Sequence, residues 1–191
     1  MVSFLATMDA ARRKPTYQDL VALSDDVIGE IVAGDLHASP RPAGRHSLAG
    51  STLAGSLVPP FHFGDGGPGG WWILFEPETH LGDNVIVPDL AGWRRERMSE
   101  PPESAFIDLR PDWVCEILSP STARLDRVKK LPVYASFGVP HAWLLDPIAK
   151  TLEVLRLEGG RWIVAGLHGD DDVVRAEPFE AIELRLRRLW G

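Results

Sequence analysis

The chain is poor in cysteine, with Cys115 as the one example among 191 residues. A single cysteine forms no disulfide within the chain, so a packed core must supply the stability. The sequence also has no apolar run near the roughly 18 to 20 residues that a membrane-spanning helix requires. Residues 1–8 lack the basic leader of a secretory signal, and the expected location is therefore the reducing cytoplasm.

An excess of positive charge is missing as well. The 27 Asp and Glu residues outnumber the 20 Lys and Arg residues, which gives a formal net charge of −7. Such a chain does not wrap nucleic acid with its whole surface, because a polyanion needs neutralising cations around it. A protein that contacts nucleic acid only locally, around an acidic metal site, remains compatible with this charge.

The length and a hydrophobic content of 45% suit one domain of ordinary size. We expect a flexible leader over residues 1–15 and a single domain over residues 16–191. Helical spacing and capping residues, such as Thr16 with Asp19 three residues later, predict helices over 17–23, 44–57 and 124–137. Alternation and turn residues predict strands over 28–37 (a hairpin turning at 34–35), 71–75, 85–93, 113–118, 142–145, 150–157, 161–167 and 181–186.

Proline and glycine refine this outline. The segment 59–70 is rich in both and is predicted to be a loop, the best candidate for mobility. Pro132 should kink or split the third helix, and Pro88 should produce a bulge in its strand. Together the elements predict an α/β (α+β) domain with a central mixed β-sheet, flanking helices and a β-rich C-terminal part.

Two acidic residues lie on or beside apolar strand patterns. Asp89 follows Val87-Pro88, and Glu116 lies in the apolar run 113–118. A buried carboxylate costs several kcal/mol unless it is compensated, and a divalent cation between two of them is one such compensation. The pair therefore indicates a Mg²⁺ or Mn²⁺ site, with the backbone carbonyl of Ile117 as a third oxygen ligand. Phosphodiester hydrolysis is the leading hypothesis for such a site.

A polar stripe follows on the third predicted helix. Asp126, Lys130 and Tyr134 are spaced four residues apart, so they share one helix face. Near a metal site this stripe is suited to orienting a water molecule or a phosphate. The alternative is an ordinary salt bridge beside an aromatic residue, and by itself that alternative is the better explanation.

Three other side chains have less certain roles. Glu30, in an apolar strand pattern, is either a third carboxylate at the metal or an exposed residue of the hairpin. His46 lies at the start of the 44–57 helix and has the spacing of no metal-binding motif, so capping or surface exposure is the better interpretation. Cys115 points into the core on the strand period and is expected to be inert.

In chain order these motifs resemble the Uma family of bacterial proteins, which are predicted restriction-like endonucleases of the PD-(D/E)xK superfamily. The resemblance covers about residues 16–190. It rests on Glu30-Ile31-Val32-Ala33-Gly34-Asp35-Leu36, on Val87-Pro88-Asp89, on Glu116-Ile117-Leu118-Ser119-Pro120-Ser121-Thr122, on Asp126, Lys130 and Tyr134, and on Gly138-Val139-Pro140-His141-Ala142-Trp143-Leu144-Leu145-Asp146-Pro147.

The resemblance implies a role for each matching residue. Asp89 is the metal-binding aspartate, Glu116 the second acidic residue, and Glu30 the glutamate of the N-terminal element. The superfamily pattern has a lysine two residues after the second acid, where this chain has Leu118. In this family the lysine has moved to the following helix.

Lys130 matches that displaced position, and Lys129 is its adjacent competitor. Asp126 and Tyr134 would then hold the side chain of Lys130 in position. Lys129 would have the same supporting role if Lys130 is the displaced lysine.

The implied activity is Mg²⁺- or Mn²⁺-dependent hydrolysis of DNA, by a homodimer or higher homo-oligomer if both strands are cut. A membrane partner is not expected. Two alternatives remain open: a catalytically silent nucleic-acid-binding or regulatory protein on a nuclease scaffold, and a structural protein whose buried acids only pair with Arg or Lys.

Overall fold

A computed structural model describes residues 13–191, so most of the predicted leader over residues 1–15 lies outside the described residues. Its strands form a six-stranded, a four-stranded and a two-stranded sheet. The large sheet has the order β10-β9-β8-β7-β6-β3, with β3 Trp71–Phe75, β6 Leu90–Arg94, β7 Trp113–Ile117, β8 His141–Asp146, β9 Thr151–Glu158 and β10 Arg161–Gly169. The four-stranded sheet has the order β2-β1-β5-β4, with β1 Val27–Val32, β2 Asp35–Pro40, β4 Thr79–Leu81 and β5 Asn84–Ile86. The two-stranded sheet pairs β11 Val173–Val174 with β12 Leu184–Arg185.

The helices lie between and around these sheets. They are α1 Tyr17–Val21, α2 Gly44–Leu57, the π-helix η1 Val58–Phe63, α3 Ala123–Leu125, the π-helix η2 Asp126–Lys130, α4 Leu131–Ser136 and α5 Arg187–Trp190. In residues 13–191 no helix combines the length and hydropathy of a membrane span.

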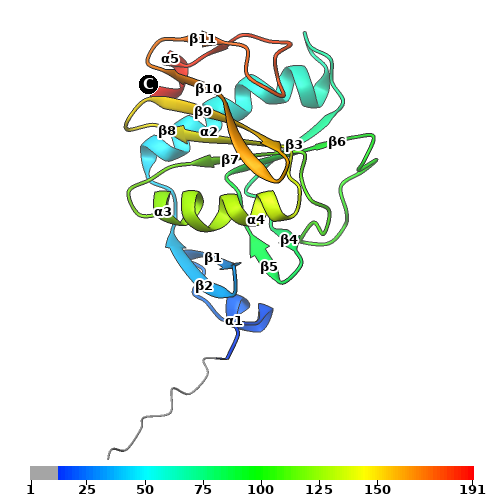
Figure 1. The fold of residues 1–191 in the computed structure, drawn as a ribbon, viewed down its shortest axis with the longest axis vertical. Helices are drawn as coiled ribbons and strands as arrows, with labels where there is room; N and C mark the ends of the chain where they lie inside the picture. Colours follow the sequence, from blue (N-terminus) through cyan, green and yellow to red (C-terminus); the bar gives the residue numbers. More distant parts are fainter. Residues whose placement is uncertain (1–12) are drawn as a thin grey trace, which may run out of the picture.

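The large sheet is mixed, as predicted, because β7 and β8 pair in parallel while its other neighbours are antiparallel. The parallel pair requires a crossover, which is supplied by the consecutive helices α3, η2 and α4. These helices cover one face of the sheet, and α2 covers the other (Figure 1). The domain therefore has a helix–sheet–helix arrangement, with the small sheet of β1, β2, β4 and β5 below it.

The side-chain alternation along β7 decides which residues face which helix. Trp113, Cys115 and Ile117 belong to the core cluster under α2. Val114 and Leu118 belong to the opposite cluster, together with Leu131 and Tyr134 of the crossover. Glu116 follows the same alternation, so it faces the crossover helices, as the strand period predicted.

The predicted strand over 85–93 is wrong as a single strand with a bulge. Residues 84–86 pair in the small sheet, whereas residues 90–94 pair in the large one. The segment Val87-Pro88-Asp89 carries the chain from one sheet to the other. Pro88 lacks a backbone N–H and cannot donate to a sheet ladder, which is consistent with its place between strands.

The π-helices account for two further differences. The loop predicted over 59–70 begins later than expected, because residues 58–63 continue α2 as η1. Pro132 does not split the crossover helix, because α3, η2 and α4 follow one another without a break; the turn before the proline, which lacks a backbone N–H, widens into η2. On α2, Leu53 and Leu57 are buried in the core, whereas Leu48 is 42% exposed and lies outside the apolar face.

Smaller predictions are also settled. The capping box at Thr16 is present, although α1 ends two residues earlier than expected. The β1–β2 hairpin turns at Ala33-Gly34, one residue before the predicted turn, with both residues at positive φ. The strand expected over 181–186 is reduced to β12, and α5 and β11 were not foreseen.

Candidate active site

Asp89 stands where the chain enters β6. Its Oδ2 accepts a hydrogen bond of 2.6 Å from the peptide N–H of Ile117, the last residue of β7. Its Oδ1 lies 3.1 Å from Nε2 of His46, in the first turn of α2. The two carboxylate oxygens are thus held by different elements, and the carboxylate has one fixed orientation.

Glu116 lies on the central strand β7 and is almost fully buried, at 1% exposure. Tyr134 donates its hydroxyl to Oε1 at 2.5 Å, and Nζ of Lys130 lies 3.1 Å from Oε2. Both partners come from the crossover helices that cover this face. The prediction that Tyr134 supports Lys130 therefore needs correction, because its hydrogen bond goes to Glu116.

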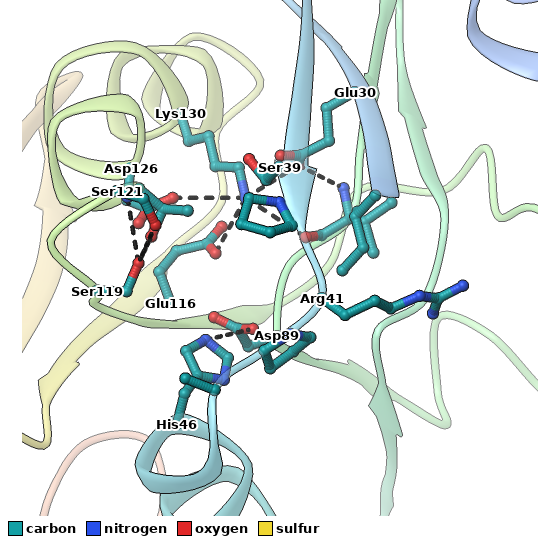
Figure 2. A pocket seen from close by; sticks show the side chains of 16 residues that line it. Glu30, Ser39, Arg41, His46, Asp89, Glu116, Ser119, Ser121, Asp126 and Lys130 are labelled. Atoms are coloured by element: carbon teal, nitrogen blue, oxygen red, sulfur yellow. Dashed lines mark hydrogen bonds and ion pairs between the residues drawn. The ribbon is translucent and has the colours of Figure 1, made fainter. Parts of the chain in front are cut away.

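Lys130 lies at the centre of the acidic residues. Its Nζ is 2.9 Å from Glu30 Oε1, 3.1 Å from Glu116 Oε2 and 3.5 Å from Asp126 Oδ1. Figure 2 shows its side chain reaching from the helix toward Glu30 and Glu116. The sequence-predicted set of Glu30, Glu116, Asp126 and Lys130 is therefore brought together in space.

The competing lysine points elsewhere. Nζ of Lys129 lies 3.7 Å from Asp35 at the edge of the hairpin, and both side chains are substantially exposed. The two lysines are consecutive residues of η2 and point in different directions, so only one of them reaches the buried cluster. The structure places Lys130 there.

Glu30 belongs to the interior and not to the solvent face of its hairpin. It is 3% exposed, and its Oε1 accepts a hydrogen bond of 2.8 Å from the N–H of Val87. This bond ties β1 to the segment that carries Asp89. Of the two predicted roles, the exposed one is wrong.

The carboxylates outnumber the ammonium group that neutralises them. Glu30, Asp89, Glu116 and Asp126 surround one lysine. Burial raises the pKa of Glu116 well above its usual value, although the charge of Lys130 opposes the shift. Burial also raises the pKa of Asp126 to about 6. Four carboxyl groups thus share one ammonium group, and the raised pKa values mean that full ionisation of the cluster requires more positive charge than Lys130 supplies.

The pKa of Lys130 responds in the opposite sense. Burial alone lowers it, but the charges of Glu116 and Glu30 outweigh that effect and leave the pKa well above its usual value. The amine is therefore protonated at neutral pH and acts as the internal counter-ion of the site.

The donor set fits a divalent cation, because hard carboxylate oxygens with uncompensated charge are what Mg²⁺ and Mn²⁺ bind. Within residues 13–191, however, no three His, Cys, Asp or Glu side chains already stand together as a cation cage. The salt bridge from Lys130 occupies one oxygen of Glu116, and Tyr134 occupies the other. The Ile117 carbonyl remains a predicted ligand, since the contact seen here is made by its N–H.

These groups line one cavity of about 130 Å³. Its walls carry Glu30, Asp89, Glu116, Asp126, Lys130 and His46, and its rim carries Arg41 and the hydroxyl residues Ser39, Ser119, Ser121 and Thr122. One bound water needs about 10–15 Å³, so the cavity holds an ion with several waters or one phosphate group.

His46 is the site residue that sequence reasoning underestimated. Ala43 is the residue that precedes α2, and the structure shows no side-chain cap there, so the predicted capping role is wrong. The His46 side chain is 12% exposed, which also contradicts a surface role. No motif spacing connects His46 with Asp89, because α2 and β6 meet only through tertiary packing.

Comparisons with known proteins bear on the family and the fold of the chain. The family described as "Uma2: Putative restriction endonuclease" matches residues 15–187. A crystal structure from Anabaena variabilis ATCC 29413, described as "a putative nuclease belonging to DUF820", aligns with a TM-score of 0.73 and 22% sequence identity over 92% of this chain and 97% of that one. This likeness shows the fold. Among curated proteins there is no match.

Proposed function

Because the chain belongs to the Uma2 family, whose description is a restriction endonuclease, we propose that it is a metal-dependent DNA endonuclease with its active site at Asp89, Glu116 and Lys130. One observation carries this proposal. Two sheets and the crossover helices bring four carboxylates and one lysine to a cavity of phosphate size. A structural core has no need of such an excess of buried charge, which is costly to maintain.

Asp89 and Glu116 would hold Mg²⁺ or Mn²⁺, with the Ile117 carbonyl as a further ligand. A bound ion of this kind lowers the pKa of a coordinated water and neutralises charge on the phosphate. The hydrogen bond from Ile117 fixes the orientation of Asp89, and Tyr134 does the same for Glu116. This orientation needs no rearrangement of β7, since both carboxylates line the cavity at its end.

Lys130 would orient the attacking water or stabilise the charge that develops on the phosphate. Its long aliphatic stem lets an amine on the helix reach the place that a lysine at position 118 would reach from the strand. Glu30 and Asp126 hold the ammonium within 3.5 Å from two further sides. Their role would be to position Lys130 and keep it protonated.

The rim is suited to the rest of the DNA backbone. Ser119 Oγ lies 2.9 Å from both Ser121 Oγ and Thr122 Oγ1, so three hydroxyl groups are gathered at one side of the cavity. Arg41 is exposed on the other side. Hydroxyl and guanidinium groups are common phosphate contacts and carry no sequence information themselves.

A catalytically silent nuclease scaffold is the second candidate. The observation that favours it is the fully buried ion-pair cluster of Lys130, together with Leu118 at the usual lysine position. In such a protein Lys130 would permanently neutralise the acids. Metal binding and strand cleavage distinguish the two candidates.

The test is cleavage of supercoiled plasmid and of single-stranded DNA with Mg²⁺ or Mn²⁺. The variants are Asp89→Asn, Glu116→Gln and Lys130→Met, with Lys129→Met as the matched control. We expect nicking by the wild type and by Lys129→Met, and loss of nicking in the other three. Metal binding without any cleavage by the wild type would favour the silent scaffold, and an absence of metal binding would favour a purely structural role.

A homodimer is also proposed, since cutting both strands of a duplex requires two active sites related by a twofold axis. Sedimentation equilibrium of the full chain measures this directly. A monomer at micromolar concentration, with nicking but no linearisation of plasmid, would oppose the dimer while leaving the active site unaffected.

A further inference from the structure

We propose that His46 is a metal ligand which, beside Asp89, gives the site a nitrogen donor and a preference for Mn²⁺ and similar transition-metal ions over Mg²⁺. This inference rests on the proposed function, because it concerns the same cavity. It goes beyond the acidic residues and the lysine, which provide only oxygen donors and an ammonium group.

The first argument is the distance between the two donors. Nε2 of His46 and Oδ1 of Asp89 are 3.1 Å apart. Two ligands at adjacent octahedral positions, each about 2.0–2.2 Å from the ion, lie about 3 Å from one another. The imidazole and the carboxylate therefore already have the spacing of neighbouring ligands.

The second argument is that both donors are fixed. The other oxygen of Asp89 is bound to the Ile117 N–H, which leaves Oδ1 directed at His46. The turn of α2 after His46 packs closely against the sheet at Gly50. A Cβ added to Gly50 would lie 3.1 Å from the side chain of Ile117 and 3.2 Å from that of Phe75, so a larger residue would not fit without a shift. Close packing at a glycine brings the first turn of α2 near the end of β7 and holds His46 over the cavity.

The contact seen in the structure is an ion pair between Nε2 of His46 and Oδ1 of Asp89. In our proposal the metal ion takes the place of the proton between the same two atoms. To bind the ion, the imidazole must lose the proton on Nε2. This proton passes to solvent as the metal binds.

Imidazole is a better ligand for Mn²⁺ and later transition metals than for Mg²⁺, which prefers an all-oxygen set. Loss of the nitrogen donor should therefore weaken Mn²⁺ binding selectively. Simple loss of negative charge, as in Asp89→Asn, should instead weaken the binding of both ions. This difference separates a ligand from a residue that only affects the electrostatics of the site.

The experiment uses calorimetric titration of the full-length, metal-free protein with Mn²⁺ and with Mg²⁺, in the absence of DNA. The variants are His46→Gln, which can still donate a hydrogen bond to Asp89, and His168→Gln on β10 as the matched control. We expect His46→Gln to weaken Mn²⁺ binding by about tenfold or more and Mg²⁺ binding much less, since ligand-shell changes typically cost 10–100-fold in affinity. His168→Gln should bind both ions like the wild type.

Pulsed EPR on the Mn²⁺-loaded wild type gives a second readout that requires no variant. A histidine ligand produces ¹⁴N coupling to the ion, and an all-oxygen site produces none. Absence of this coupling, or unchanged Mn²⁺ affinity in His46→Gln, overturns the inference while the nuclease proposal stands. Failure of the wild type to bind either ion overturns both.

Discussion

The ammonium nitrogen of Lys130 lies 3.1 Å from Oε2 of Glu116, and both side chains are buried. The pair joins the π-helix η2 to the central strand β7. The same ammonium is 2.9 Å from Glu30 on β1, so one cation links the N-terminal hairpin, the main sheet and the crossover. This linkage leads to predictions about both stability and chemistry.

Replacement of Lys130 by methionine should destabilise the metal-free protein at neutral pH by about 3–5 kcal/mol, because buried carboxylates would lose their counter-ion. Urea denaturation in EDTA measures the effect. Lys129→Met is the control and should change the unfolding free energy by less than about 1 kcal/mol, since its ion pair is exposed. Equal effects of the two variants would contradict the assignment of the buried lysine.

Tyr134→Phe should reduce the free energy of unfolding by about 1–3 kcal/mol, because Glu116 would lose a buried hydrogen-bond donor. The chain's other tyrosine, Tyr17, is 41% exposed and provides the matched control. Chemical denaturation of both variants decides the comparison. If Tyr17→Phe costs as much as Tyr134→Phe, the hydrogen bond to Glu116 contributes little.

Asp126 predicts a dependence of stability on pH. Burial raises its folded-state pKa from 3.8 to about 6, so the folded protein keeps a proton that the unfolded chain releases. This contribution to stability is complete below the unfolded pKa and is lost as the pH rises through about 6. The ionised form is therefore the unfavourable one in the folded protein.

Asp126→Asn removes this titration. We compare the unfolding free energy of the variant with that of the wild type at each pH. This difference should shift in favour of the variant by up to about 3 kcal/mol from pH 4 to pH 8, as a shift of two pKa units implies. The measurement is the difference in unfolding free energy at the two pH values, with EDTA present. An equal difference at pH 4 and pH 8 would show that Asp126 does not titrate in this range.

Leu118→Lys would restore the superfamily spacing, yet we expect it to lower stability and not to increase cleavage. Leu118 is 3% exposed and packs in the cluster with Val114 and Leu144. A lysine there would lose the apolar packing of Leu118, and its ammonium group would be desolvated beside that of Lys130 among the same acids. Leu118→Met preserves the volume and should cost less than about 1.5 kcal/mol. Faster cleavage by Leu118→Lys at undiminished thermal stability would show that the lysine has not moved to the helix.

Much of the fold follows from local sequence. The alternation along 113–118 predicted which side of β7 carries Glu116, and Thr16 with Asp19 predicted the capping box. These features depend on residues a few positions apart, and the physical rules for such neighbours can be applied without knowing the rest of the molecule.

The sequence alone also determined the chemistry available, namely acids in apolar strands and a polar stripe of Asp126, Lys130 and Tyr134. The tertiary structure decided which of these groups meet. It placed Lys130 and not Lys129 among the acids. It also paired the hydroxyl of Tyr134 with Glu116 and the imidazole of His46 with Asp89. Such contacts join elements distant in the chain, and they depend on how α2 and the crossover pack against the sheet, which no local spacing records.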